Sequence, residues 1–150
     1  YYMREFIKKE LELWISQIRT NIDREGANAS GKARSSLRVN VEGDKYQIVA
    51  CDYFPMLESG YDGKNPPAPR NFTTIIEQWT RDKGMTFQDE EERKDVAGRI
   101  AYFIQENGTK LHRQGGRTSI YTDVINAQLG DFKKRLKEQF STTISEWQKK

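Results

Sequence analysis

A glycine- and proline-rich loop divides the sequence after a short apolar segment. Residues 57–67 run Leu-Glu-Ser-Gly-Tyr-Asp-Gly-Lys-Asn-Pro-Pro, and residues 75–79 run Ile-Ile-Glu-Gln-Trp. Because glycine and proline interrupt both helices and strands, the chain must leave one kind of structure here and enter another. The loop carries no catalytic constellation, so we expect it to be a surface that docks on something else.

Long helices are expected at both ends of the chain. Apolar residues recur at three- and four-residue spacing from Met3 to Ile22, and the pattern stops before Gly26. A second long helix is expected over residues 123–147, where Gly130 costs about 1 kcal/mol relative to alanine. Its apolar residues form a seam close to a heptad repeat: Ile125, Leu129, Phe132, Leu136, Phe140, Ile144 and Trp147.

An antiparallel hairpin is expected between the first helix and the loop. Apolar and polar residues alternate over residues 37–42, residues 42–44 suit a tight turn, and residues 46–51 return as a second strand. We expect residues 54–57 to extend or bend that strand, since Pro55 cannot donate to a central ladder.

Two further helices are expected between the loop and the last helix. The first is short, capped by Thr73 or Thr74 and stopped by Gly84. The second has Asp89 as its N-cap and ends at Gly108. Residues 109–117 have loop composition, and residues 110–120 could hold a further short strand. The predicted fold class is α+β, with long terminal helices and two central helices packed on a small antiparallel sheet, in one domain over residues 1–150.

Composition limits the class of protein. A chain of 150 residues suits one domain with a modest core. Its 25 basic and 22 acidic residues give a net charge of +3, whereas nucleic-acid binders usually carry a clustered basic excess. The sequence holds neither a membrane-length apolar run nor a signal-peptide pattern, so we expect a soluble protein made inside the cell, with no membrane partner. A single cysteine, Cys51, excludes a disulfide within this chain.

Residues suited to catalysis or metal binding are scarce. Nothing in the sequence brings His112, the only histidine, to Cys51 as a Cys–His pair requires. A transition-metal site needs more than one imidazole or thiolate. The acidic run at residues 89–92 suits a helix start, and its side chains point in different directions. We therefore expect no enzymatic activity, no cofactor and no metal.

Several motifs nevertheless follow one another in a distinctive order. Residues 30–37, Ser-Gly-Lys-Ala-Arg-Ser-Ser-Leu, precede the hairpin, and residues 57–60, Leu-Glu-Ser-Gly, close it. The later motifs are Pro66-Pro67, Ile76 with Trp79, residues 83–85 (Lys-Gly-Met), and a helix pattern that ends in Gly108-Thr109. Over about residues 30 to 110 this order resembles the tail-completion or neck proteins of tailed double-stranded DNA phages, also described as minor tail or virion-morphogenesis proteins.

The sequence departs from that pattern at one place. Many members of that family carry an Arg-Pro-Phe element after the loop, whereas this chain reads Pro69-Arg70-Asn71-Phe72. Phe72 could fill the same anchoring role.

The resemblance implies a non-enzymatic head-tail connector subunit of the virion, assembled in the cytoplasm of the host bacterium. It implies a closed ring of six- or twelve-fold symmetry, which contacts portal or adaptor proteins and tail-tube or tail-terminator proteins. DNA would pass through the lumen transiently and without sequence specificity. The implied contacts with a neighbouring subunit or ring lie in the loop: Glu58, Gly60, Tyr61, Asp62, Gly63, Lys64, Pro66 and Pro67. The implied core anchors of the loop's far end are Phe72, Ile76 and Trp79.

Two other hypotheses stay open. Lys110, Arg113 and Arg117 share a loop that could contact DNA, either in a ring lumen or in a small DNA-binding or nuclease-associated protein. A metal-dependent enzyme would instead need Glu58, Asp62 and one of residues 89–92 to converge. The basic group at residues 133–137 lies opposite the apolar seam, so we expect a solvated face there.

Overall fold

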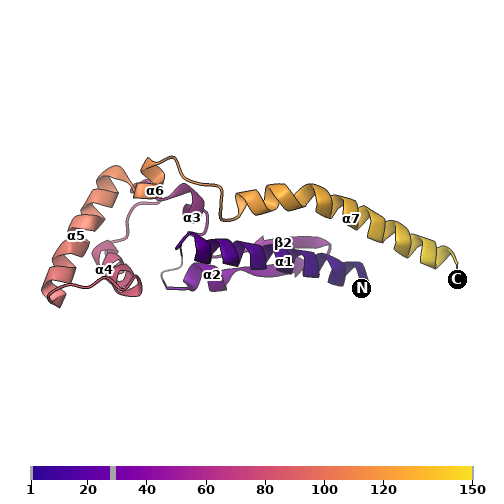
Figure 1. The fold of residues 1–150 in the computed structure, drawn as a ribbon, viewed down its shortest axis with the longest axis horizontal. Coiled ribbons are helices and arrows are strands. Elements are labelled where there is room, and N and C mark those ends of the chain that lie inside the picture. The colour runs from indigo at the N-terminus through magenta and orange to yellow at the C-terminus, as the bar shows by residue number, and fades with distance from the viewer. Residues whose placement is uncertain (1, 28–29, 150) are drawn as a thin grey trace.

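The computed structural model describes residues 2–27 and 30–149, which form an elongated molecule with two lobes (Figure 1). This mixture of helices with one antiparallel sheet confirms the predicted α+β class. The first lobe, called the body below, consists of α1 (Tyr2–Arg24), α2 (Lys32–Ser36), β1 (Arg38–Glu42), β2 (Lys45–Val49) and α7 (Thr122–Gln148). The second lobe is the α4–α5 hairpin, formed by α4 (Phe72–Asp82) and α5 (Glu90–Asn107). Between the lobes lie α3 (Met56–Ser59) and α6 (Lys110–Arg113).

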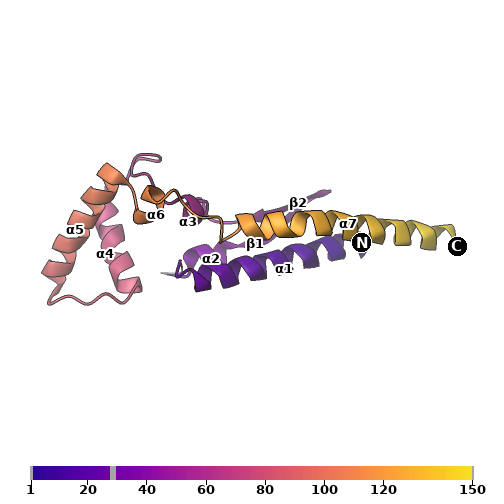
Figure 2. The same cartoon turned by 45° about the horizontal axis from the view of Figure 1, so that its top comes forward.

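The core of the body forms where α1 meets the sheet and α7. The buried stripe of α1 consists of Leu11, Trp14, Ile15, Ile18 and Ile22, as the periodicity predicts. It packs with Leu37, Phe54, Ile120 and Val124. Trp14 meets Phe132 of α7 edge to face, with ring centroids 5.4 Å apart. In both views α7 runs along α1 and continues past its N-terminal end (Figure 2).

The predicted hairpin is present, with Val39 opposite Ile48 and Val41 opposite Tyr46. Gly43 has a φ of 58°, which permits the tight turn between the strands. The second strand ends at Val49 rather than at residue 51. Beyond it, the backbone N–H of Cys51 donates to Ser36 Oγ at 3.0 Å.

The α4–α5 hairpin has a hydrophobic cluster of its own. Phe72 and Ile76 of α4 pack against Ala97 and Ala101 of α5, and both alanines are fully buried. Small side chains at the contact let the two helix axes approach closely. The buried residues therefore form two clusters, where the length and composition suggested one modest core.

Several element boundaries agree with the sequence. The Asp89 carboxylate accepts the backbone N–H of Glu92 at 2.8 Å, which makes it the predicted N-cap of α5. Gly108, with a φ of 81°, ends that helix. Gly84, with a φ of 72°, follows the end of α4. Among the described residues no helix is both long and apolar enough to cross a bilayer.

Other expectations were wrong. Phe54 and Pro55 lie in a turn, and Met56 and Leu57 already belong to α3, so this segment does not extend the strand. The φ of Pro55, −57°, suits a helix start. Residues 110–113 form α6, not a strand, and Thr109 caps it by accepting the His112 N–H. α4 begins at Phe72, so Thr73 and Thr74 lie inside it. The short helix α2 was not predicted; the neighbouring residues 28 and 29 lie outside the described part of the chain.

Candidate functional site

The glycine- and proline-rich loop lies between the lobes. There the segment that leaves the body, which contains α3, is hydrogen-bonded to the segment that returns to it, which contains α6. The Thr109 N–H donates to the carbonyl oxygen of Tyr61 at 2.8 Å, and the Tyr61 N–H donates to Thr109 Oγ1 at 3.1 Å. Closer to the body, the Arg117 N–H donates to the carbonyl oxygen of Glu58 at 2.8 Å. These bonds hold the two segments side by side, and α3 of one contacts α6 of the other (Figure 2).

Glu58 is buried, 6 % exposed, and its carboxylate binds the start of α7. Its Oε2 accepts the backbone N–H groups of Ile120 at 3.2 Å, Tyr121 at 2.8 Å and Thr122 at 2.9 Å, and its Oε1 accepts the Thr122 hydroxyl. The first N–H groups of a helix lack partners within the helix and carry partial positive charge, so a carboxylate stabilises them. Glu58 therefore acts as an N-cap supplied from elsewhere in the chain.

Two glycines of the loop are required by close approach within the same chain. A Cβ at Gly60 would lie 2.4 Å from the backbone nitrogen of His112, and a Cβ at Gly63 would lie 2.1 Å from the carbonyl oxygen of Ile104. Both also have positive φ angles, of 70° and 86°. Gly60 and Gly63 therefore allow the loop to pack closely against residues 104–112 of the same chain.

The middle of the loop is a turn organised by Asp62. Its Oδ1 accepts the N–H groups of Lys64 at 2.8 Å and Asn65 at 2.7 Å. These backbone bonds, chiefly the one from Lys64, lower the pKa of the Asp62 carboxyl below its ordinary value, and His112 adds a smaller contribution. The Tyr61 hydroxyl donates to the Pro66 carbonyl, and burial raises the pKa of that hydroxyl.

The predicted interface residues are thus divided between two environments. Glu58 and Gly63 are buried, and Gly60, Tyr61 and Asp62 are half-buried against the returning segment. Of the predicted interface residues, only those at the tip are exposed: Lys64, Pro66 and Pro67. These three are therefore the predicted interface residues most available to another molecule.

Two of the three predicted loop anchors lie in the hydrophobic cluster of the α4–α5 hairpin. Phe72 and Ile76 are buried there, and Tyr61 meets Phe72 edge to face at 6.2 Å. Trp79 is 39 % exposed and lies outside the cluster, so its assignment as a core anchor was wrong. The α4–α5 hairpin is only two helices thick, and the flank that carries Trp79 is left partly open to solvent.

The basic residues predicted to contact DNA do not form one free patch. Arg117 is half-buried, donates to the carbonyl oxygen of Leu57 at 2.9 Å, and lies 3.8 Å from the Glu25 carboxylate. The Arg113 guanidinium lies over the Phe103 ring at 5.0 Å. Lys110 is exposed. The three basic side chains therefore lie in different environments, and Arg117 stabilises the connection between the lobes.

The basic group of α7 is also divided. Arg135 donates to Glu10 of α1 at 2.8 Å, and Glu10 together with the neighbouring charges raises the pKa of the guanidinium. The expectation of a wholly solvated face was therefore wrong for this residue. Lys133, Lys134 and Lys137 are exposed, as expected.

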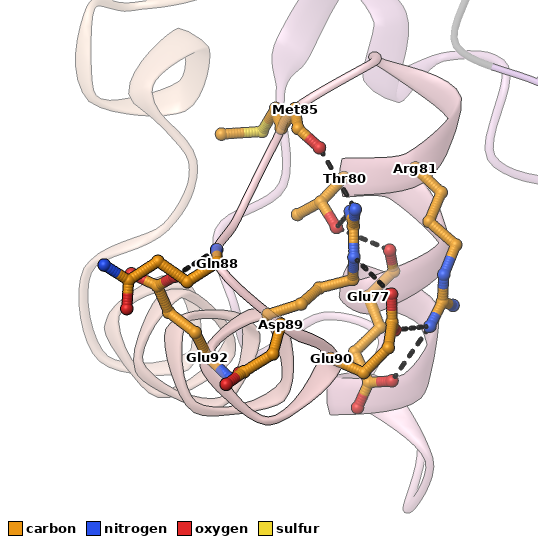
Figure 3. A network of polar contacts seen from close by, with 9 residues as sticks. Glu77, Thr80, Arg81, Met85, Gln88, Asp89, Glu90 and Glu92 are labelled. Atoms are coloured by element: carbon orange, nitrogen blue, oxygen red, sulfur yellow. Dashed lines mark hydrogen bonds and ion pairs between the residues drawn. The ribbon is translucent and has the colours of Figure 1, made fainter.

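A polar network closes the far end of the α4–α5 hairpin (Figure 3). Arg93 donates to Thr80 Oγ1 at 2.8 Å and to the Met85 carbonyl at 3.1 Å, which fastens the turn between the helices. Arg81 of α4 donates to Glu90 of α5 at 2.7 Å, and this contact lowers the pKa of the Glu90 carboxyl. The acidic start of α5 thus cross-links its own hairpin.

The carboxylates considered for a metal site do not converge. Glu58 binds the start of α7, whereas Asp89 and Glu90 lie at the opposite end of α5 from the loop (Figure 1). Within residues 2–27 and 30–149, no group of three or more His, Cys, Asp or Glu side chains is placed to hold a metal ion. A metal-dependent reaction through these carboxylates is therefore unsupported by their positions.

Exposed large apolar side chains are the most conspicuous surface feature. On the body they lie mainly along α7, including Leu129, Phe140 and Trp147. On the α4–α5 hairpin they include Tyr102 and Phe103 of α5. Such residues are the usual content of protein–protein contacts when they gather on one face.

No protein-family model, curated protein or solved structure matches this chain.

Proposed function

We propose that this chain is a structural subunit of the virion, part of the neck or tail-completion ring that connects head and tail in a tailed double-stranded DNA phage. The observation that carries the proposal is the exposure of large apolar side chains on both lobes. Phe140 is 54 % exposed on the body, and Tyr102 is 68 % exposed on the α4–α5 hairpin. A chain with two separate apolar surfaces can bind one neighbour through each of them.

Two different contact surfaces favour a ring. When one surface of a subunit binds a different surface of the next, the contact is heterologous, and repetition gives a ring if the rotation closes. The elongated, two-lobed shape keeps these surfaces far apart within one copy (Figure 1). The assignment to a phage rests, in addition, on the order of sequence motifs over about residues 30 to 110. Portal or adaptor proteins and tail proteins are then the expected neighbours above and below the ring.

The alternative of a small DNA-binding protein has less support. It would use Lys110, Arg113 and Arg117 together, yet Arg117 binds Leu57 and Glu25 of its own chain. Phosphate contacts make DNA affinity rise steeply as salt is lowered. Tight binding to DNA at low salt that weakens steeply with added salt would favour this alternative over the ring.

Purified particles of the phage that encodes this chain provide the direct test. Peptide mass spectrometry should detect the chain in intact virions, and immunogold labelling should place it between head and tail. Absence of the chain from the particles would overturn the phage assignment. Detection only in the capsid shell or the tail fibres would overturn its place at the neck.

A further inference from the structure

The outer side of α5 carries a stripe that no other described element packs over, and the depression along it is lined by α5 residues only. Glu91, Asp95, Gly98 and Tyr102 follow one another at intervals of four, three and four residues, so they lie on one side of the helix. They line a shallow, open depression together with Lys94 and Arg99 at its margins. Tyr102 is exposed, and Asp95 pairs with Arg99 at 2.7 Å in a contact between two exposed side chains. Such an exposed pair contributes little and can rearrange.

A matching stripe lies on the exposed side of α7. Asn126, Gly130, Lys133 and Lys137 are also separated by four, three and four residues, and all are exposed. Phe140 continues the stripe towards the C-terminal end of the helix, and Leu129 lies at its edge; both are exposed. The side chains of Lys133 and Lys137 make no hydrogen bond or ion pair within the described residues. The α7 face is therefore basic with an apolar margin, whereas the α5 stripe itself carries two carboxylates and an exposed tyrosine, with Lys94 and Arg99 beside it.

The glycine in each stripe is not explained by packing inside one copy. A Cβ at Gly98 would meet its nearest neighbour, Thr73 Cγ2, at 3.9 Å, and a Cβ at Gly130 would meet nothing within 4 Å. Neither glycine has a positive φ. Glycine in a helix interior is less stable than alanine, so each weakens its helix without serving the monomer. The absence of a side chain does permit another helix to approach closely.

We propose that α5 of one copy packs antiparallel on α7 of the next copy, with Gly98 facing Gly130. Because the two stripes have the same spacing, this alignment places Asp95 opposite Lys133, Glu91 opposite Lys137 and Tyr102 opposite Asn126. α5 and α7 lie in different lobes at opposite ends of the molecule (Figure 1), so one copy cannot make the contact with itself. The inference rests on the proposed function in taking the occupant to be a second copy, and it identifies the heterologous contact of the ring.

Charge reversal tests this pairing through self-association, measured by sedimentation velocity of the full chain at low salt. The variant E91K/D95K has lysines on the α5 stripe as well as the native lysines on α7. The variant K133E/K137E has carboxylates on the α7 stripe as well as the native carboxylates on α5. Each variant alone should remain monomeric, because its α5 and α7 stripes then repel. An equimolar mixture should associate again, because every α5–α7 contact between unlike copies becomes complementary. The wild-type chain should associate, and added salt should weaken it.

A matched control has the same change of net charge elsewhere. Glu12→Lys with Asp44→Lys alters two exposed carboxylates of the body, and this variant should associate like the wild type. Circular dichroism on all variants checks that they are folded. Normal association of E91K/D95K, failure of the mixture to associate, or a wild-type chain that stays monomeric at its highest soluble concentration would each overturn the inference.

The glycines supply a second readout that charge does not affect. Gly98→Ala should raise the melting temperature of the monomeric charge variant, because alanine favours the helix, and should weaken association of the otherwise wild-type chain. Unchanged or tighter association of Gly98→Ala would contradict close approach at this position.

Failure of this inference is distinguishable from failure of the proposed function. If the chain is found at the phage neck but E91K/D95K associates normally, the α5–α7 contact is wrong and the ring role stands. If the reversal and the mixture behave as expected but the chain is missing from particles, the contact stands and the phage role falls.

Discussion

Glu58 and Thr122 lie 64 residues apart in the sequence, yet the carboxylate of Glu58 accepts both the backbone N–H of Thr122, at 2.9 Å, and its hydroxyl. This relationship joins the end of α3 to the start of α7 and closes the connection between the lobes on the side of the body. It assigns a structural role within one subunit to a residue that the sequence placed at a subunit interface.

Replacing Glu58 should destabilise the whole body. Glu58→Ala removes the acceptor for three backbone N–H groups in a buried position, so we expect a loss of about 3 kcal/mol or more in the free energy of unfolding. Glu58→Gln retains one carbonyl oxygen and should lose less. Urea denaturation followed by circular dichroism measures both. Equal stability of Glu58→Ala and the wild type would show that the cap contributes nothing.

Two glycines with similar φ angles should differ sharply in their tolerance of alanine. Gly60 and Gly84 have φ angles of 70° and 72°, but only at Gly60 would a Cβ meet backbone atoms, at 2.4 Å. Gly84→Ala should cost about 1–2 kcal/mol from left-handed backbone strain alone. Gly60→Ala must also move α6, and we expect it to lower the yield of folded protein. Melting temperatures compare the two, and similar losses would argue against the close approach.

Truncating Ile76 of α4 to alanine should destabilise the protein more than truncating Trp79, although Trp79 is the larger residue. Ile76 is buried, and truncation to alanine should cost about 2–4 kcal/mol because it leaves a cavity beside Ala97 and Ala101. Trp79, although larger, is partly exposed, and Trp79→Ala should cost about 1 kcal/mol. Hydrogen exchange of α5 amides reports the local effect. A larger loss at Trp79 than at Ile76 would restore its role as an anchor.

The Asp62 turn should be sensitive to acid. Bonds from the Lys64 and Asn65 N–H groups lower the pKa of Asp62 in the folded state below its unfolded value. The contribution of the turn is therefore complete above the unfolded pKa and is lost as the pH falls through the folded one. Carboxyl carbon NMR should give Asp62 a pKa below the ordinary value of an aspartate. Asp62→Asn should remove the corresponding acid-dependent change in the Lys64 amide signal, and its persistence would contradict the assignment.

The features predictable from the sequence are those that depend on a few neighbouring residues. The hairpin follows from alternation and a turn glycine, and the ends of α5 follow from Asp89 and Gly108. The four-residue helices α3 and α6 are too short to show a periodicity, so residues 54–57 and 110–120 were assigned wrongly. The candidate surface on α7 was visible as an apolar seam. Which part of the seam α1 covers became clear only in three dimensions.

The four longer helices, the hairpin and the scarcity of catalytic groups were predictable from the sequence, since propensity, periodicity and capping act over short distances. Three-dimensional coordinates were needed to show that Glu58 caps α7, that Trp79 is partly exposed, and that a Cβ at Gly98 or Gly130 would meet no close contact. Each of these depends on which distant segments meet. The burial of a side chain and the choice of its partner depend on contacts between segments that are distant in the sequence, and no local pattern encodes those contacts.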